Sequence, residues 1–195
     1  MTGVERCYLY CEQVEKGKIT TNKWVKLAVK RFRSDLKRST KKDYPFYFDE
    51  DAANRYCQFV ELLKQYKDRF AGKPLILENW QCFIFCNIYG WLYKDTKQRR
   101  FRKTFVFVAR KNGKSTLMST TLLWDLLATN GAEAYAAATK RDQAKILYDS
   151  VKQMVLQNEV LKNKLKIYVA YSRIINEKKA GKLEALSADA DTMDG

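Results

Sequence analysis

The segment TFVFVARKNGKST, residues 104–116, contains the residue types that bind the phosphates of a nucleotide. An apolar run leads into a turn, and Gly113, Lys114 and Ser115 follow it. In a loop of the pattern G-x-x-x-x-G-K-[ST], backbone N–H groups surround the phosphates, the lysine reaches the outer phosphates and the hydroxyl binds Mg²⁺. Val108 stands where this pattern has its first glycine. The segment therefore supplies the second half of a phosphate-binding loop and departs from the first half.

Two structures compete for this segment. The pair Asn112-Gly113 is a strong signal for a two-residue β-hairpin turn, which predicts alternating apolar and polar residues after the turn. The residues that follow, STLMSTTLLWDLL, do not alternate, since Leu122–Trp124 are contiguous and apolar. Ala109 is small, so the backbone can bend sharply there without a glycine. These observations favour a strand, a phosphate-binding loop and a buried helix over a hairpin.

The composition limits the chemistry of the chain. It has 195 residues, no histidine and a formal net charge of +15. The lack of histidine excludes Ser-His-Asp and Cys-His catalysis and removes the commonest metal ligand. The positive charge favours a polyanionic partner such as DNA or RNA, although a basic, well-solvated surface would give the same count.

The five cysteines allow two readings. Cys7 and Cys11, and likewise Cys82 and Cys86, are four residues apart and would share a helix face, so four thiolates could hold zinc. Buried free thiols are the commoner outcome. The odd number of cysteines and the lack of a secretory signal indicate a reducing cytoplasm. No apolar run approaches the ~20 residues that cross a bilayer, so no membrane role is expected.

The hydrophobic periodicity predicts a helical first half and an α/β second half. The expected helices are 4–15, 21–37, one that begins at Asp49 or Asp51, 78–90, 116–128 and 141–157. The expected strands are 101–109, 133–139, 166–171 and 181–188. The alternation of strands and helices predicts a parallel sheet with flanking helices, of the P-loop NTPase type, preceded by a helical N-terminal region. The predicted division is a basic helical region at 1–75 and the front part of an ATPase domain at 76–195.

Three stretches together resemble the large terminase subunits of tailed bacteriophages. FRKTFVFV followed by ARKNGKST resembles the nucleotide loop of that family, which lacks the first glycine and carries an arginine soon after the strand. KPLILENWQCFIFCNIYGW resembles a family segment around Leu-Glu-Pro-Trp-Gln, with Asn79 in place of the proline. LEALSADADTMDG is similar to the segment just before the family's acidic ATPase strand. The resemblance covers the chain from about Phe48 onward.

The resemblance implies an ATPase that drives viral DNA into a procapsid. Its expected cofactors are ATP and Mg²⁺, and its expected substrate is double-stranded DNA. Its family partners are the small terminase subunit and the portal protein. The complete protein is expected to form a homo-oligomer in the host bacterial cytoplasm.

The site residues follow from the loop pattern and from the resemblance. The loop pattern assigns Lys114 to the β- and γ-phosphates and Ser115 to Mg²⁺. The resemblance suggests that Arg110 reaches the γ-phosphate and, with Lys114, serves catalysis, whereas a DNA contact or an exposed charge is its alternative. The nucleotide-binding set is Ala109, Arg110, Lys111, Asn112, Gly113, Lys114, Ser115 and Thr116.

Two further positions extend the predicted site. The resemblance suggests that Gln81 reads adenine through its amide and that Trp80 packs beside it. Their alternatives are a polar residue at a helix start and a core aromatic. Lys140 and Arg141, after an expected strand, are candidates for DNA phosphate contacts, whereas helix capping and a solvated face are the favoured explanation of both residues. Other basic clusters, Arg99–Lys103 among them, make a plausible DNA footprint.

An acidic pair for hydrolysis is missing from the expected place. Such an ATPase needs one carboxylate that orders Mg²⁺ and another that orients the attacking water. Asp189, Asp191 and Asp194 lie on a polar, turn-like stretch. The resemblance places the acidic strand and a nuclease domain beyond Gly195, so we expect this chain alone to bind ATP weakly and hydrolyse it poorly. Two alternatives stay open: another nucleic-acid-stimulated P-loop ATPase, such as a helicase-like protein, and a basic nucleic-acid-binding module without nucleotide chemistry.

Overall fold

The computed structural model describes residues 1–187 of the chain. The candidate carboxylates Asp189, Asp191 and Asp194 therefore lie outside the described residues. The chain divides into two compact units, one of Met1–Leu62 with Leu75–Val106 and one of Leu63–Pro74 with Phe107–Gly195. No helix in the part of the chain that the structure describes has the length and apolar character needed to cross a membrane.

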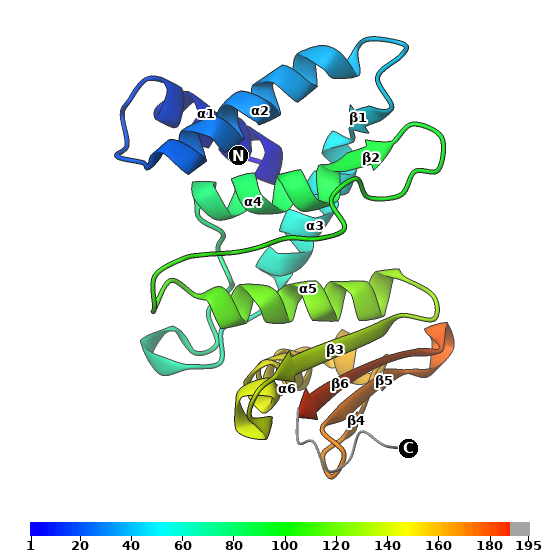
Figure 1. Cartoon of the computed structure of the whole chain (residues 1–195). Coiled ribbons are helices and arrows are strands. Elements are labelled where there is room, and N and C mark those ends of the chain that lie inside the picture. The colour runs from blue at the N-terminus through cyan, green and yellow to red at the C-terminus, as the bar shows by residue number, and fades with distance from the viewer. Residues whose placement is uncertain (188–195) are drawn as a thin grey trace. The chain divides into compact units, whose positions relative to one another are not determined.

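Four helices and a two-stranded sheet build the first unit (Figure 1). The helices are α1 (Gly3–Glu15), α2 (Lys23–Ser39), α3 (Glu50–Leu62) and α4 (Asn79–Gly90). The strands β1 (Phe46–Phe48) and β2 (Trp91–Tyr93) pair antiparallel. The helix starts follow from capping residues: Thr2 and Glu5 form a capping box at α1, and Asn22 accepts hydrogen bonds from two N–H groups of α2.

Aromatic rings fill the core of the first unit. Phe32 of α2 is fully buried and meets the rings of Phe48, Phe83 and Trp91 edge-on or nearly so, at centroid distances between 5.3 and 6.0 Å. Gly90 lies against this cluster, because a Cβ at that position would come within 2.4 Å of the Phe48 ring. The absence of a side chain at the end of α4 thus lets the ring pack directly on the backbone.

A buried ion pair holds α2 to the segment after β2. Asp35 accepts a hydrogen bond from the Arg100 guanidinium at 2.7 Å and another from the Tyr44 hydroxyl at 2.7 Å. Arg100 also donates to the Tyr44 hydroxyl at 3.0 Å and lies over the Phe46 ring. The two charged side chains are 5% and 17% exposed. The basic cluster at 99–103 thus contains one arginine that is committed to the core and does not serve a DNA surface.

The five cysteines are reduced and buried in the first unit. Within the described residues, no group of three or more His, Cys, Asp or Glu side chains could hold a metal ion, so the structure supports buried thiols and not a zinc site. A hydrogen bond from Cys11 raises the pKa of Cys7, a hydrogen bond from Cys57 raises the pKa of Cys82, and burial raises both pKa values further. These thiols therefore stay protonated and inert.

Thiol labelling tests this packing. At pH 8 the native chain is expected to react with a disulfide reagent such as dithiobis(nitrobenzoate) on the order of 1000-fold more slowly than the unfolded chain, because each thiol reacts only in opened molecules. The unfolded chain in guanidinium should titrate five thiols. Fast labelling of any thiol in the native chain would contradict the burial described above.

The second unit is a four-stranded mixed sheet with helices against it (Figure 1). The strands are β3 (Glu133–Ala138), β4 (Lys166–Tyr168), β5 (Arg173–Asn176) and β6 (Gly181–Ser187), and the helices are α5 (Lys114–Ala128), α6 (Arg141–Leu156) and α7 (Glu159–Lys162). Short 3₁₀ turns lie at Asp68–Phe70 and Glu177–Lys179. The strand order is β3-β6-β5-β4, and α5 and α6 contact β3 and β6. Ala134, Ala136, Ile174 and Leu183 are buried in this layer.

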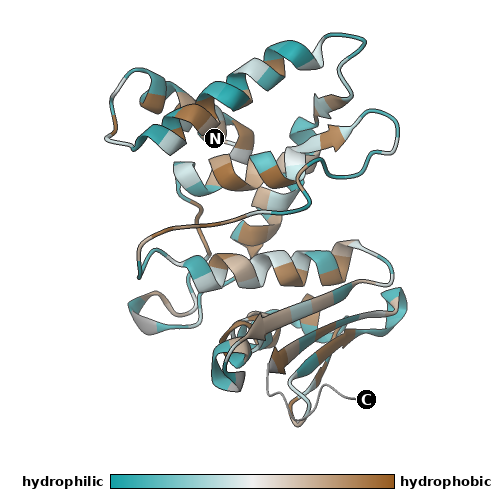
Figure 2. Ribbon diagram, viewed as in Figure 1, coloured by the Kyte–Doolittle hydropathy of each residue, from teal (hydrophilic) through white to brown (hydrophobic). Residues whose placement is uncertain are grey.

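The sheet differs from the sequence prediction in two ways. Only β3 and β6 run parallel, because β4 and β5 form an antiparallel hairpin that pairs antiparallel with β6. The strand predicted at 101–109 is wrong: residues 101–109 form no strand. Phe105 and Phe107 are 89% and 90% exposed, and Figure 2 shows this segment as a run of hydrophobic residues between β2 and α5. A β-branched and aromatic run becomes a strand only when another strand satisfies its backbone.

Candidate functional site

The candidate loop leads directly into a helix, as the nucleotide-site interpretation requires. Residues 110–113 form a turn, and α5 begins at Lys114. Gly113 is the N-cap residue and has φ +71°, in the left-handed region that glycine enters without strain. The competing hairpin is therefore excluded, because a helix of 15 residues follows Asn112-Gly113 and no strand does.

The Asn112 side chain holds the turn, and the backbone of the turn is strained at Lys111. The Asn112 side-chain amide donates to the carbonyl oxygens of Ala109 and Arg110 at 3.3 and 3.4 Å. Lys111 has φ +67°, which is costly for a residue with a Cβ, on the order of 1–3 kcal/mol. Strained positions of this kind are concentrated at ligand-binding loops.

The start of α5 is an open site for an anion. No side chain caps this helix end. Among the described residues, no acceptor takes a hydrogen bond from the backbone N–H groups of residues 110–116. These free donors, together with the positive end of the helix dipole, suit a phosphate. The backbone of the loop and of the helix start thus offers a phosphate both hydrogen-bond donors and a favourable dipole, independently of the side chains.

The side chains around these donors are cationic or hydroxylic. Arg110, Lys111 and Lys114 are exposed. Lys114 forms no ion pair with any side chain in the described part of the chain. Ser115 is exposed in the first turn of α5, beside the half-buried Thr116. The structure brings the whole predicted set from Ala109 to Thr116 together in one loop and one helix turn. Which of these atoms contact a nucleotide stays a prediction.

A buried serine fixes the first turn of α5 to α6. The Ser119 hydroxyl lies 2.9 Å from the carbonyl oxygen of Ser115 and 3.3 Å from that of Leu147 in α6. Ser119 is fully buried, so its polar group requires such acceptors. The sequence analysis missed this residue. The available signal was weak: Ser119 follows Ser115 by four positions, which is the spacing of a hydroxyl that bonds to the carbonyl one helix turn earlier.

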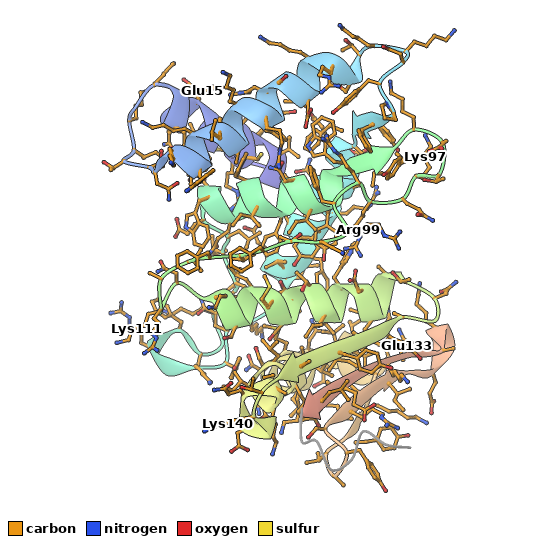
Figure 3. All side chains as sticks on the ribbon, in the orientation of Figure 1. Glu15, Lys97, Arg99, Lys111, Glu133 and Lys140 are labelled. Carbon is orange, nitrogen blue, oxygen red and sulfur yellow. The ribbon has the colours of Figure 1, made fainter. Side chains whose placement is uncertain are left out.

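Lys140 and Arg141 lie where β3 gives way to α6. Lys140 is the N-cap residue of α6 and Arg141 is its first residue. The side chain of Lys140 makes no capping hydrogen bond. Figure 3 shows Lys111 and Lys140 at the same side of the second unit. A contact of Lys140 or Arg141 with DNA stays a prediction.

Trp80 and Gln81 belong to the first unit, in the first turn of α4. The Gln81 amide oxygen accepts the Glu78 N–H at 2.8 Å and completes a capping box. The structure therefore supports the helix-start role of Gln81. An amide oxygen has a second lone pair and the amide nitrogen has two donors, so a role in reading adenine stays a prediction.

Comparisons with known proteins agree with the loop and the fold around it. A family model described as "Terminase large subunit, ATPase domain" matches residues 79–195. A solved structure, the crystal structure of the HK97 bacteriophage large terminase, is similar with a TM-score of 0.58 and 25% sequence identity. That match covers 73% of this chain and 29% of the HK97 chain, so this chain spans less than a third of the length of that protein. Comparison with curated proteins returned no match.

Proposed function

The chain belongs to the family of the terminase large subunit ATPase domain, and from that membership we propose that it binds ATP at the loop before α5 and serves a motor that moves double-stranded DNA into a procapsid. The HK97 relative named above is a phage large terminase. The observation that carries the proposal is the uncapped start of α5, with N–H groups that no acceptor among the described residues takes and with the exposed Lys114 as the first helical residue. Water satisfies such exposed donors when no ligand is present, so a phosphate can replace it there.

The residues present fit a nucleotide with its magnesium ion. The uncapped N–H groups of the loop suit the phosphate oxygens, Lys114 suits the outer phosphates, and the Ser115 hydroxyl suits the metal. When bound, Mg²⁺ neutralises phosphate charge and orients the phosphate chain.

Arg110 is the residue we assign to developing charge on the γ-phosphate. It lies four residues before Lys114, is exposed, and begins a turn whose N–H groups donate to no acceptor among the described residues. A guanidinium can contact two phosphate oxygens at once, which suits a transition state with charge spread over three oxygens. We place Gln81 and Trp80 at the adenine, and Lys140 and Arg141 at DNA phosphates.

The remaining parts of the proposal concern the complete motor. Hydrolysis requires a carboxylate that activates water, and we assign that role to no residue within 1–187. The small terminase subunit and the portal protein are its proposed partners, in a homo-oligomer in the host bacterial cytoplasm.

A linked binding experiment tests the function. A fluorescent ATP analogue is titrated with Mg²⁺ into the full chain, with and without blunt duplex DNA. We expect saturable nucleotide binding that duplex DNA strengthens about fivefold or more, because coupled sites change each other's affinity reciprocally. A lack of nucleotide binding would contradict the proposed function and would favour the alternative of a basic nucleic-acid-binding module. Coupling to single-stranded but not duplex DNA would favour a helicase-like ATPase.

A further inference from the structure

A groove with two unlike walls lies between α1 and α2, within the first unit. It encloses about 560 Å³. One wall is the end of α1 with Val14 and Glu15, and the other is a face of α2 with Lys26, Lys30, Arg33 and Lys37. Nothing in the nucleotide site uses these residues, and Figure 2 shows α2 as mostly hydrophilic on its visible face.

The α2 wall is a row of cations. Lys26, Lys30 and Lys37 are exposed, and none of them makes an ion pair among the described residues. Their spacing places them on one face of the helix, over about 16 Å at 1.5 Å per residue. Three free ammonium groups on one wall predict an occupant that carries several negative charges.

The α1 wall has the opposite character. Glu15, labelled in Figure 3, accepts hydrogen bonds from the Arg33 guanidinium at 3.2 Å from each of two nitrogens, and both residues line the groove. The C-terminal end of α1, with the negative end of its dipole, is on the same side. The side chains of Val14 and Val29 form an apolar floor, 4% and 1% exposed.

This combination discriminates between anionic occupants. A nucleic-acid backbone carries uniform negative charge, so the carboxylate and the helix end would repel it from one wall. The groove lining contains no aromatic side chain on which an unpaired base could stack. A polypeptide can present carboxylates to one wall, N–H donors to the other and an apolar side chain to the floor.

We propose that the groove between α1 and α2 is a docking site for an acidic segment of a partner protein. Carboxylates of the segment pair with Lys26, Lys30 and Lys37. Donors of the segment face Glu15, and an apolar side chain covers Val14 and Val29.

The test uses the full chain and a fluorescent peptide of repeated Glu-Glu-Leu-Leu units, with a Gln-Gln-Leu-Leu peptide for comparison. We expect the acidic peptide to bind more tightly than the neutral one and to weaken with added salt. The variant K26E/K30E/K37E should bind the acidic peptide about tenfold or more weakly, since three exposed pairs are reversed. The matched control K145E/K164E/K178E changes the charge equally at three exposed lysines of the second unit.

Two results would overturn the proposal. Equal loss of peptide binding in both triple variants would show that net charge, and not the groove, attracts the peptide. Loss of blunt duplex DNA binding in the groove variant alone, with the peptide unaffected, would assign the groove to nucleic acid. Circular dichroism of each variant shows whether it is folded, so that a loss of binding caused by misfolding is recognised.

Discussion

Replacing Lys114 with alanine is expected to weaken ATP binding about 10- to 150-fold, because the variant loses a charged hydrogen bond to phosphate worth about 1.5–3 kcal/mol. At a free ATP concentration of about 100 times the dissociation constant, bound ligand stabilises a protein by about 2.7 kcal/mol. For a chain of this size, that raises the melting temperature by about 5–10 °C. The measurement is thermal unfolding with Mg²⁺ and increasing ATP, in which Lys114→Ala should lose about half of the shift if binding weakens about tenfold and nearly all of it if binding weakens about 150-fold.

The matched control is Lys145→Ala. Lys145 is exposed on α6, so the substitution removes the same charge outside the loop. It should keep the full ATP-dependent shift, and neither variant should change the melting temperature without ATP by much, because surface substitutions are usually within ±0.5 kcal/mol. An unchanged ATP-dependent shift in Lys114→Ala would mean that ATP does not bind at this loop, and it would contradict the proposed nucleotide site.

Replacing Arg100 with methionine is expected to destabilise the first unit by about 3 kcal/mol. The change leaves the carboxylate of Asp35 buried at 5% exposure without its main partner, and breaking a buried ion pair costs about 3–5 kcal/mol. We take the lower end because Arg100 is 17% exposed and Arg38 still lies 3.8 Å from Asp35. Urea unfolding followed by tryptophan fluorescence measures the effect, since Trp91 lies beside the Arg100 guanidinium.

A double variant separates the ion pair from simple packing. In Asp35→Asn/Arg100→Met the buried charge is gone, so the loss should be smaller than the sum of the two single losses. Arg102→Met is the control, because Arg102 is exposed in the same segment. If the single and double losses add, or if Arg102→Met costs as much as Arg100→Met, the charge pair does not stabilise the unit as inferred.

The helices were largely predictable from the sequence. Their apolar spacing and capping residues are local, so the predicted helix at 21–37 corresponds to α2 and that at 116–128 to α5 within two residues at each end. The turn that leads into α5 was predictable for the same reason. The contiguous run Leu122–Trp124 rejects a hairpin without any tertiary information, and the structure confirms the helix.

The pairing of strands was not predictable in the same way. The apolar run at 101–109 has the composition of a buried strand. Whether it forms one depends on a neighbouring strand to pair with, and composition does not identify that strand. Conversely, β5 is only four residues long and was missed, because a short hairpin partner has little periodicity of its own. Arg100 shows the same limit, since its neighbours suggest a DNA surface and only the tertiary fold brings Asp35 to it.

The hydroxyl of Ser119 has one proton and two carbonyl neighbours, one in the helix turn that carries the loop and one in α6. A hydroxyl cannot donate fully to both, so small displacements of Ser115 change how that proton is divided. A ligand bound at the loop would thereby change the hydrogen bond from Ser119 to the backbone of α6, the helix whose first residues follow Lys140. This shared proton therefore couples the turn at residues 110–113 to α6 within the second unit.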